Sequence, residues 1–487
     1  MTDIFTSLPP ELRLGILLHL NSRSRIAPLL KASPCMLAQY QESKILIRRG
    51  FIKAELADGL LQDALAVVLF PQQDGPIPKA DRKEVQRHVE RWSQGQLPDP
   101  FHLKDYPTIE SLDRLYHRLS TYIEDYITKA TSKYPPRAYL CLPDLSSKRG
   151  RLLFRNKQIG QNVIKIDYLT DAERRRLLQA FLRYEFLCKV NLLGADASHK
   201  IVTTAHGQLT AWECEAIQSV YSYIQALYGA TYAHFADSWL PDIPNTLVTE
   251  AHEKISDDGL RFPDNVYFDS NTYFGDMNTN FESAPTVMHL AFAGFDPITT
   301  LLMFPRDETG CPQGLIPWLS RMSSRYEDEL SPYRAAFIAV SERTEAKGDL
   351  EQSPRVYQSL RAKVPGPLYI DDLFGDPHSV LQLHVCRQRA WVFMDDARLY
   401  PHRDLSRHFP TLKQLRQQRG LHAMMSGRSA RSIRRAALRR QKGWHEEREG
   451  WFIPGIDRGR WEKDVDPGQA LYGGRFFSHT ALSSWSR

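Results

Sequence analysis

Residues 8–20 have the sequence LPPELRLGILLHL, which predicts the first helix of a mainly α-helical chain. Ser7 can cap this helix, and a proline suits its first turn, where no backbone donor is needed. Aliphatic residues recur along one side at helical spacing and give one apolar stripe. The members of this stripe are Leu12, Ile16, Leu17 and Leu20. We expect the helix to begin near residue 9 and to end before Asn21.

Two more short helices are predicted directly after it. The first covers about residues 24–32, and Ser33-Pro34 then restart the chain into another that extends from Met36 through Leu46. Three helices within the first 50 residues bury too little apolar surface to be stable alone. We therefore expect residues 1–50 to form a small helical module that packs against the rest of the chain or against a partner.

The order of these features resembles the F-box, the helical module through which substrate receptors of SCF-type ubiquitin ligases bind a Skp-type adaptor. The matching features, in chain order, are Leu8-Pro9, Glu11, Ile16-Leu17, Leu20, Leu29-Leu30 and Ala32-Ser33. The similarity is greatest to the F-box-like proteins of filamentous fungi, which share the turn at Ala32-Ser33-Pro34 and a helix that ends near Gln39-Tyr40. The chain lacks the usual tryptophan of the third helix, and Asn21 stands where an aspartate is common.

The resemblance implies a function as a substrate-recognition adaptor of a ubiquitin ligase. The apolar residues of the first helix would then bury against the Skp-type adaptor, and the body would bind a ubiquitination target. The residues implied for adaptor binding are Leu8, Pro9, Leu12, Ile16, Leu17 and Leu20.

Three later stretches extend the same resemblance. They are a Thr-x-x-Glu-Arg-Arg motif at residues 170–175, a helix that opens at Trp212-Glu213, and an Arg-Ala-Trp…Phe-x-Asp motif at residues 389–395. In the fungal proteins the middle residue of Arg-Ala-Trp is alanine or glycine. The resemblance therefore reaches beyond the N-terminal module into the body.

Residues 51–410 are expected to form a large, mainly helical body with long loops, as one or two structural units. The strongest helical periodicity covers residues 109–131, and weaker patterns predict helices at 53–70 and 81–94, the latter on the surface. A short hairpin is expected around residues 151–154. Between residues 239 and 377 we expect helices joined by long loops, with helical patches at 286–293 and 316–326.

Residues 411–487 are expected to be a basic, Trp/Arg-rich and partly disordered segment. Residues 413–442 contain ten Lys and Arg and no Asp or Glu, so the chain's net charge of +6 is local to this run. A run of this kind is most often a solvated surface, but it also allows an alternative function in nuclear interaction or nucleic-acid binding. The N-terminal helices would then be only structural. The candidate polyanion-binding residues are Arg428, Arg431, Arg434, Arg435, Arg439 and Arg440.

The sequence shows no catalytic motif. It lacks a phosphate-binding glycine loop, a Gly-x-Ser-x-Gly elbow and a His-Glu-x-x-His helix, so we expect no enzyme activity, no catalytic residue, no metal and no cofactor. His384 and Cys386 are placed to share one side of a strand, but two ligands do not make a metal site. The six cysteines follow no disulfide or metal spacing and are expected to be free thiols. With no signal peptide or membrane span apparent, we expect the protein in the cytoplasm or the nucleus.

Overall fold

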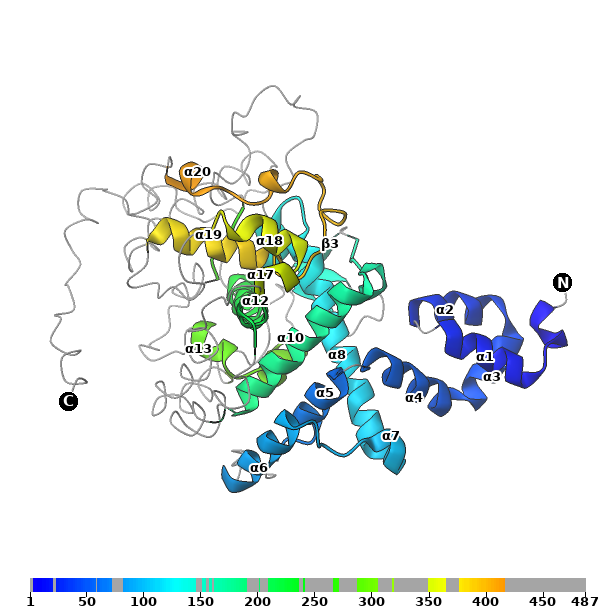
Figure 1. Cartoon of the computed structure of the whole chain (residues 1–487). Helices are drawn as coiled ribbons and strands as arrows, with labels where there is room; N and C mark the ends of the chain where they lie inside the picture. The colour runs from blue at the N-terminus through cyan, green and yellow to red at the C-terminus, as the bar shows by residue number, and fades with distance from the viewer. Residues whose placement is uncertain are drawn as a thin grey trace.

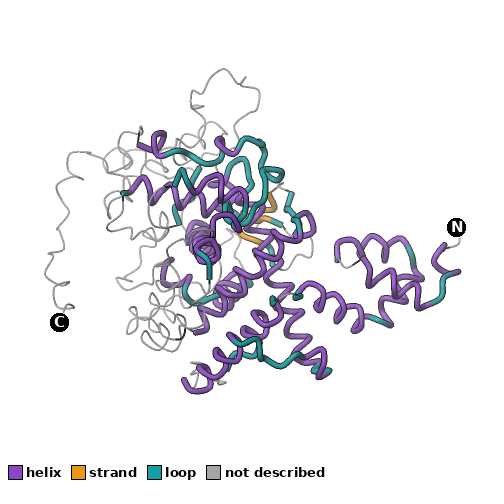
Figure 2. The backbone as a smooth tube through the Cα atoms, viewed as in Figure 1, coloured by secondary structure: helices purple, strands orange, loops and turns teal. Residues whose placement is uncertain are grey.

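Helices dominate the part of the chain that the structure describes, which confirms the mainly α fold. The structure is a computed structural model, and it describes residues 3–20, 23–57, 59–71, 82–145, 151–154, 157–159, 162–190, 201, 209–235, 240, 266–270, 287–304, 318, 349–364 and 376–416. Figures 1 and 2 show a group of N-terminal helices that projects from a larger helical body.

The N-terminal module consists of η1 (Ile4–Ser7), α1 (Pro10–Leu20), α2 (Arg23–Ala32), α3 (Pro34–Glu42) and the first half of α4 (Lys44–Glu55). Its small core is separate from that of the body and contains Leu17, Ile26, Met36 and Ile47. The side chain of Asp3 ties η1 to the start of α3. It accepts hydrogen bonds from the Ser33 hydroxyl at 2.6 Å and from the Cys35 amide at 3.1 Å, and these bonds lower its pKa.

Two segments that were each predicted as one continuous helix are interrupted in the structure, although their apolar periodicity continues across the interruption. The helix expected from Met36 through Leu46 is two helices, because the chain turns at Ser43, where φ is −103° and ψ is 15°. The prediction of a single helix over residues 53–70 is also wrong. There α4 ends at Glu55 and α5 (Leu60–Val68) begins after Gly59, whose left-handed φ of +91° suits glycine and ends the helical geometry.

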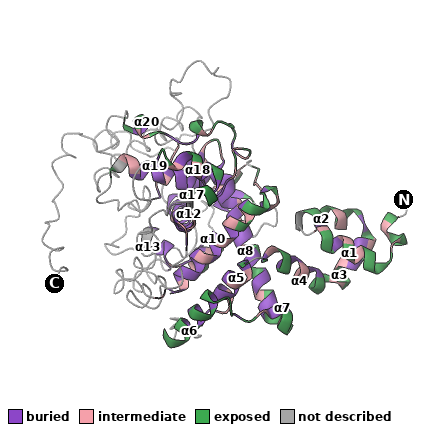
Figure 3. Ribbon diagram, viewed as in Figure 1, coloured by how far each residue is buried: buried purple, intermediate pink, exposed green. Residues whose placement is uncertain are grey.

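The body is built around long helices that pack through aromatic side chains. These are α8 (Tyr106–Ala130), α10 (Asp171–Val190) and α12 (Ala211–Phe235); α10 packs on α5 and α12, and α12 packs on α19 (Pro377–Gln388). Tyr126 and Tyr223 place their ring centroids 4.9 Å apart, and Phe181 stacks on Phe295 of α14 (Phe295–Leu302) at 5.6 Å. Figure 3 shows that these helices are mostly buried. Tyr116, Tyr122 and Tyr126 of α8 are therefore part of the core.

Shorter elements complete the body around these helices. They are α6 (Arg82–Ser93), α7 (Pro100–Leu103), α9 (Pro135–Leu140), η2 (Ile166–Tyr168), α13 (Val287–Ala291), α17 (Asp349–Gln352), α18 (Arg355–Arg361), η5 (Leu405–Arg407) and α20 (Leu412–Arg416). α6 and α13 agree with the predicted helices, and α6 buries one face through His88 and Trp92. The patch predicted at 316–326 lies outside the described residues, except for Trp318.

The expected hairpin is present. β2 (Leu152–Phe154) and β3 (Lys157–Ile159) pair antiparallel, and β1 (Leu142–Pro143) pairs with the other edge of β2. This small sheet contacts α8 and α12 through β1. It is thus an attachment to a helical body.

The C-terminal ends of α8 and α19 cap each other. The backbone carbonyls of Arg387, Gln388 and Arg389 accept hydrogen bonds from three tyrosine hydroxyls, those of Tyr126, Tyr139 and Tyr400. In return, the buried Arg389 guanidinium donates to the Ala130 carbonyl at 3.3 Å and to the Ser132 carbonyl at 2.7 Å. Helix ends leave carbonyls without partners inside the helix, so these contacts satisfy groups that would otherwise be costly to bury.

His384 and Cys386 do not share one side of a strand. Both lie on α19, where residues two apart point in different directions. Cys386 is buried, whereas His384 is half-buried. The described cysteines, which exclude Cys311, are free, as expected: Cys141, Cys188, Cys214 and Cys386 are buried and Cys35 is half-buried.

Acidification is expected to destabilise the body through His408. Its imidazole Nε2 lies 2.8 Å from the His402 carbonyl, and burial, together with the nearby charge of Arg389, lowers the pKa of His408 to about 4. Between pH 6.5 and pH 4 the unfolded chain therefore binds a proton that the folded chain does not. The free energy of unfolding should fall as pH drops through this range.

Urea unfolding at pH 7, 6 and 5 measures this slope. The variant His408→Gln should show a shallower loss of stability with pH than the wild type, whereas His102→Gln, at an exposed position, should keep the wild-type slope. Equal slopes for His408→Gln and the wild type would contradict a buried neutral imidazole.

Candidate docking surface

The N-terminal module leaves one side of α1 uncovered. Leu17 of α1 is fully buried in the module's core, and Leu14, Ile16 and Leu20 pack partly against it. On the opposite side Leu12 is 56% exposed. Because α1 carries leucines around most of its circumference, it fills the small core and still presents apolar side chains to the outside.

The six residues implied for adaptor binding fall into three groups. Pro9 and Leu12 are exposed, whereas Leu8, Ile16 and Leu20 are half-buried. Leu17 is not available to a partner, because it lies inside the module's own core. The sequence pattern predicts Leu17 in one apolar stripe with Leu12, Ile16 and Leu20. In the structure Leu17 faces the interior of the module. Pro9 and Leu12 are therefore the members of the six that a partner can reach most directly.

α4 adds apolar residues that the sequence did not single out. Ile45 is 70% exposed and Leu46 is 49% exposed on its first turn. A β-carbon added at Gly50 would come within 2.9 Å of the Leu18 side chain, so α1 crosses α4 closely at this glycine. Leu46 precedes Gly50 by four residues and therefore shares its face. The exposed apolar side chains of α1 and α4 are thus Leu12, Leu18, Ile45 and Leu46.

The second half of α4 fixes the module to the body. Phe51 and Ile52 belong to the main core, while Ile47, one turn earlier, belongs to the small core. Arg48 pairs with Asp113 of α8 at 2.9 Å, and Glu55 accepts a hydrogen bond from the Tyr116 hydroxyl at 2.8 Å. A single helix therefore spans both cores, and Figure 1 shows α1, α2 and α3 standing away from the body at its far end.

The three stretches that extend the F-box-like resemblance meet in the body. Thr170 and Glu173 form a reciprocal cap at the start of α10: the Glu173 carboxylate accepts from the Thr170 amide at 2.9 Å, and the Thr170 hydroxyl accepts from the Glu173 amide at 3.2 Å. Thr210 and Glu213 form the same cap at the start of α12. This capping box explains the Thr-x-x-Glu spacing that the sequence showed at residue 170.

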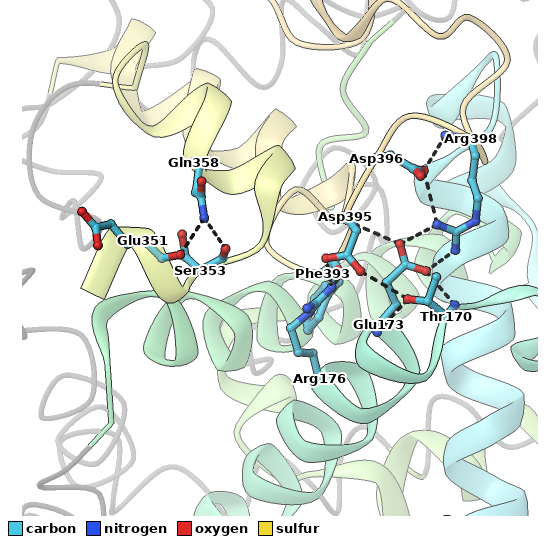
Figure 4. A network of polar contacts seen from close by, with 10 residues as sticks. All are labelled: Thr170, Glu173, Arg176, Glu351, Ser353, Gln358, Phe393, Asp395, Asp396 and Arg398. Carbon is cyan, nitrogen blue, oxygen red and sulfur yellow. Dashed lines mark hydrogen bonds and ion pairs between the residues drawn. The ribbon is translucent and has the colours of Figure 1, made fainter. Parts of the chain in front are cut away.

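The Glu173 carboxylate also binds the chain that follows α19 (Figure 4). It accepts from the Asp395 amide at 3.0 Å and from the Arg398 guanidinium at 2.9 Å, and Arg176 pairs with the Asp395 carboxylate at 2.6 Å. Burial alone would raise the pKa of Glu173, but these bonds outweigh it and leave the pKa below its ordinary value. The network joins residues more than 200 positions apart and is structural.

A second buried network lies at the end of α19. The Glu215 carboxylate of α12, which is inaccessible to solvent, accepts two hydrogen bonds at 2.8 Å from the Arg387 guanidinium and one at 3.1 Å from the Trp391 indole. Ala390 follows α19 with a left-handed φ of +55°, and the Trp391 amide bonds back to the Cys386 carbonyl. The left-handed conformation favours glycine, so alanine is strained at this position between Arg389 and Trp391.

The predicted polyanion-binding residues lie outside the described part of the chain. This holds for Arg428, Arg431, Arg434, Arg435, Arg439 and Arg440. Of the basic run, Lys413 and Arg416 are described on α20, and Arg416 pairs with Asp376 at 3.1 Å. The nuclear or nucleic-acid-binding alternative stays a prediction from sequence.

No family model, curated protein or solved structure matches the chain. Across the described ranges, no three His, Cys, Asp or Glu side chains are grouped so that they could hold a metal ion. No helix among the described residues is both long and apolar enough to cross a membrane.

Proposed function

We propose that this chain is a substrate-recognition adaptor of a ubiquitin ligase, which binds a Skp-type adaptor through α1 and α4 and a target protein through its body. The main support for the proposal is that Leu12 is exposed on a module whose core is separate from that of the body. The surface that would bind the adaptor is therefore open without rearrangement. The F-box-like order of residues 8–33 supports the identity of the partner.

The exposed apolar side chains would contribute favourably to binding of a partner. Full burial of a leucine or isoleucine side chain contributes roughly 1.5–3 kcal/mol. Leu12, Ile45 and Leu46 together would offset a substantial part of the cost of association, which is about 4–15 kcal/mol. Pro9 and the half-buried Leu8 and Ile16 add contact area around them.

Leu12→Asp is expected to abolish binding of the full-length chain to a purified Skp-type adaptor, with a loss of at least 100-fold in affinity. A charge would have to be buried in an apolar interface, at a cost of several kcal/mol. Leu12 is the suitable position because it is exposed, so the variant should keep the wild-type unfolding temperature. Ile16 is less suitable, since it packs against the module's own core. Isothermal titration calorimetry measures the affinity.

Leu103→Asp provides the matched control. Leu103 is a 68% exposed leucine on α7 of the body, so the same substitution is made outside α1 and α4. It should leave adaptor binding unchanged. Equal binding by the wild type and by Leu12→Asp, or failure of the wild type to bind any Skp-type adaptor, would reject the proposal.

A further inference from the structure

We draw no further inference here: the strongest candidate, the surface patch of exposed apolar side chains on α1 and α4 of the N-terminal module (Leu12, Leu18, Ile45 and Leu46), carries nothing beyond the proposed function, because nothing in the described part of the structure shows what covers it.

Discussion

Glu215→Ala is expected to lower the free energy of unfolding by about 3–5 kcal/mol. Glu215 is inaccessible to solvent and holds both the Arg387 guanidinium and the Trp391 indole. Alanine would leave a buried guanidinium without its counter-charge. Urea unfolding followed by circular dichroism at pH 7 measures the change.

Two further variants show whether the charge itself is the cause. Asp171→Ala removes an almost fully exposed partner of Arg174 and should change the unfolding free energy by no more than about 0.5 kcal/mol. The double replacement Glu215→Leu with Arg387→Met removes both buried charges, and it should recover much of the stability that the single variant loses. A loss below 1 kcal/mol in Glu215→Ala would show that the pair is not buried as described.

Gly229→Ala is expected to destabilise the body by about 1–3 kcal/mol, although alanine is the better helix former. A β-carbon at Gly229 of α12 would lie 2.5 Å from the backbone Cα and carbonyl oxygen of Ser270. That segment cannot withdraw easily, because the Gln388 side chain bonds both the amide and the carbonyl of Phe268 at 3.0 and 2.6 Å. α12 and residues 266–270 must therefore separate.

Gly15→Ala is the matched control for this prediction. Both glycines lie inside helices, but the space around Gly15 is open. The two alanine variants should consequently shift the thermal unfolding temperature in opposite directions, down at Gly229 and level or up at Gly15. An unchanged unfolding temperature in Gly229→Ala would mean that α12 and the 266–270 segment are not in contact.

Local patterns in the sequence predicted the helices well. The apolar period of residues 109–131 matches α8, and the Thr-x-x-Glu spacing marks the start of α10, because both signals depend on neighbours within a few residues. The breaks at Ser43 and Gly59 were missed, since the apolar period continues through them. Their positions depend on which core each helix joins.

The candidate site was only partly predictable for the same reason. Leu12 and Leu17 belong to one apolar pattern, and only the packing of α1 on α3 and α4 separates an exposed leucine from a buried one. Ile45 and Leu46 looked like continuation of a helix core. The convergence of residues 170–176 with 393–398 involves separations above 200 residues, which no local pattern encodes.

The mutual capping of α8 and α19 has a consequence for how the chain folds. Arg389 reaches the Ala130 carbonyl across 259 residues, and Tyr126 reaches Arg387 across 261. Contacts so distant in sequence form slowly, because a long loop must close first. During synthesis the contacts within the core of the N-terminal module, which are local in sequence, can form early. The end of α8 can be capped only after residue 389 has been synthesised. A truncated product without α19 would therefore expose the uncapped end of α8, which favours aggregation and degradation.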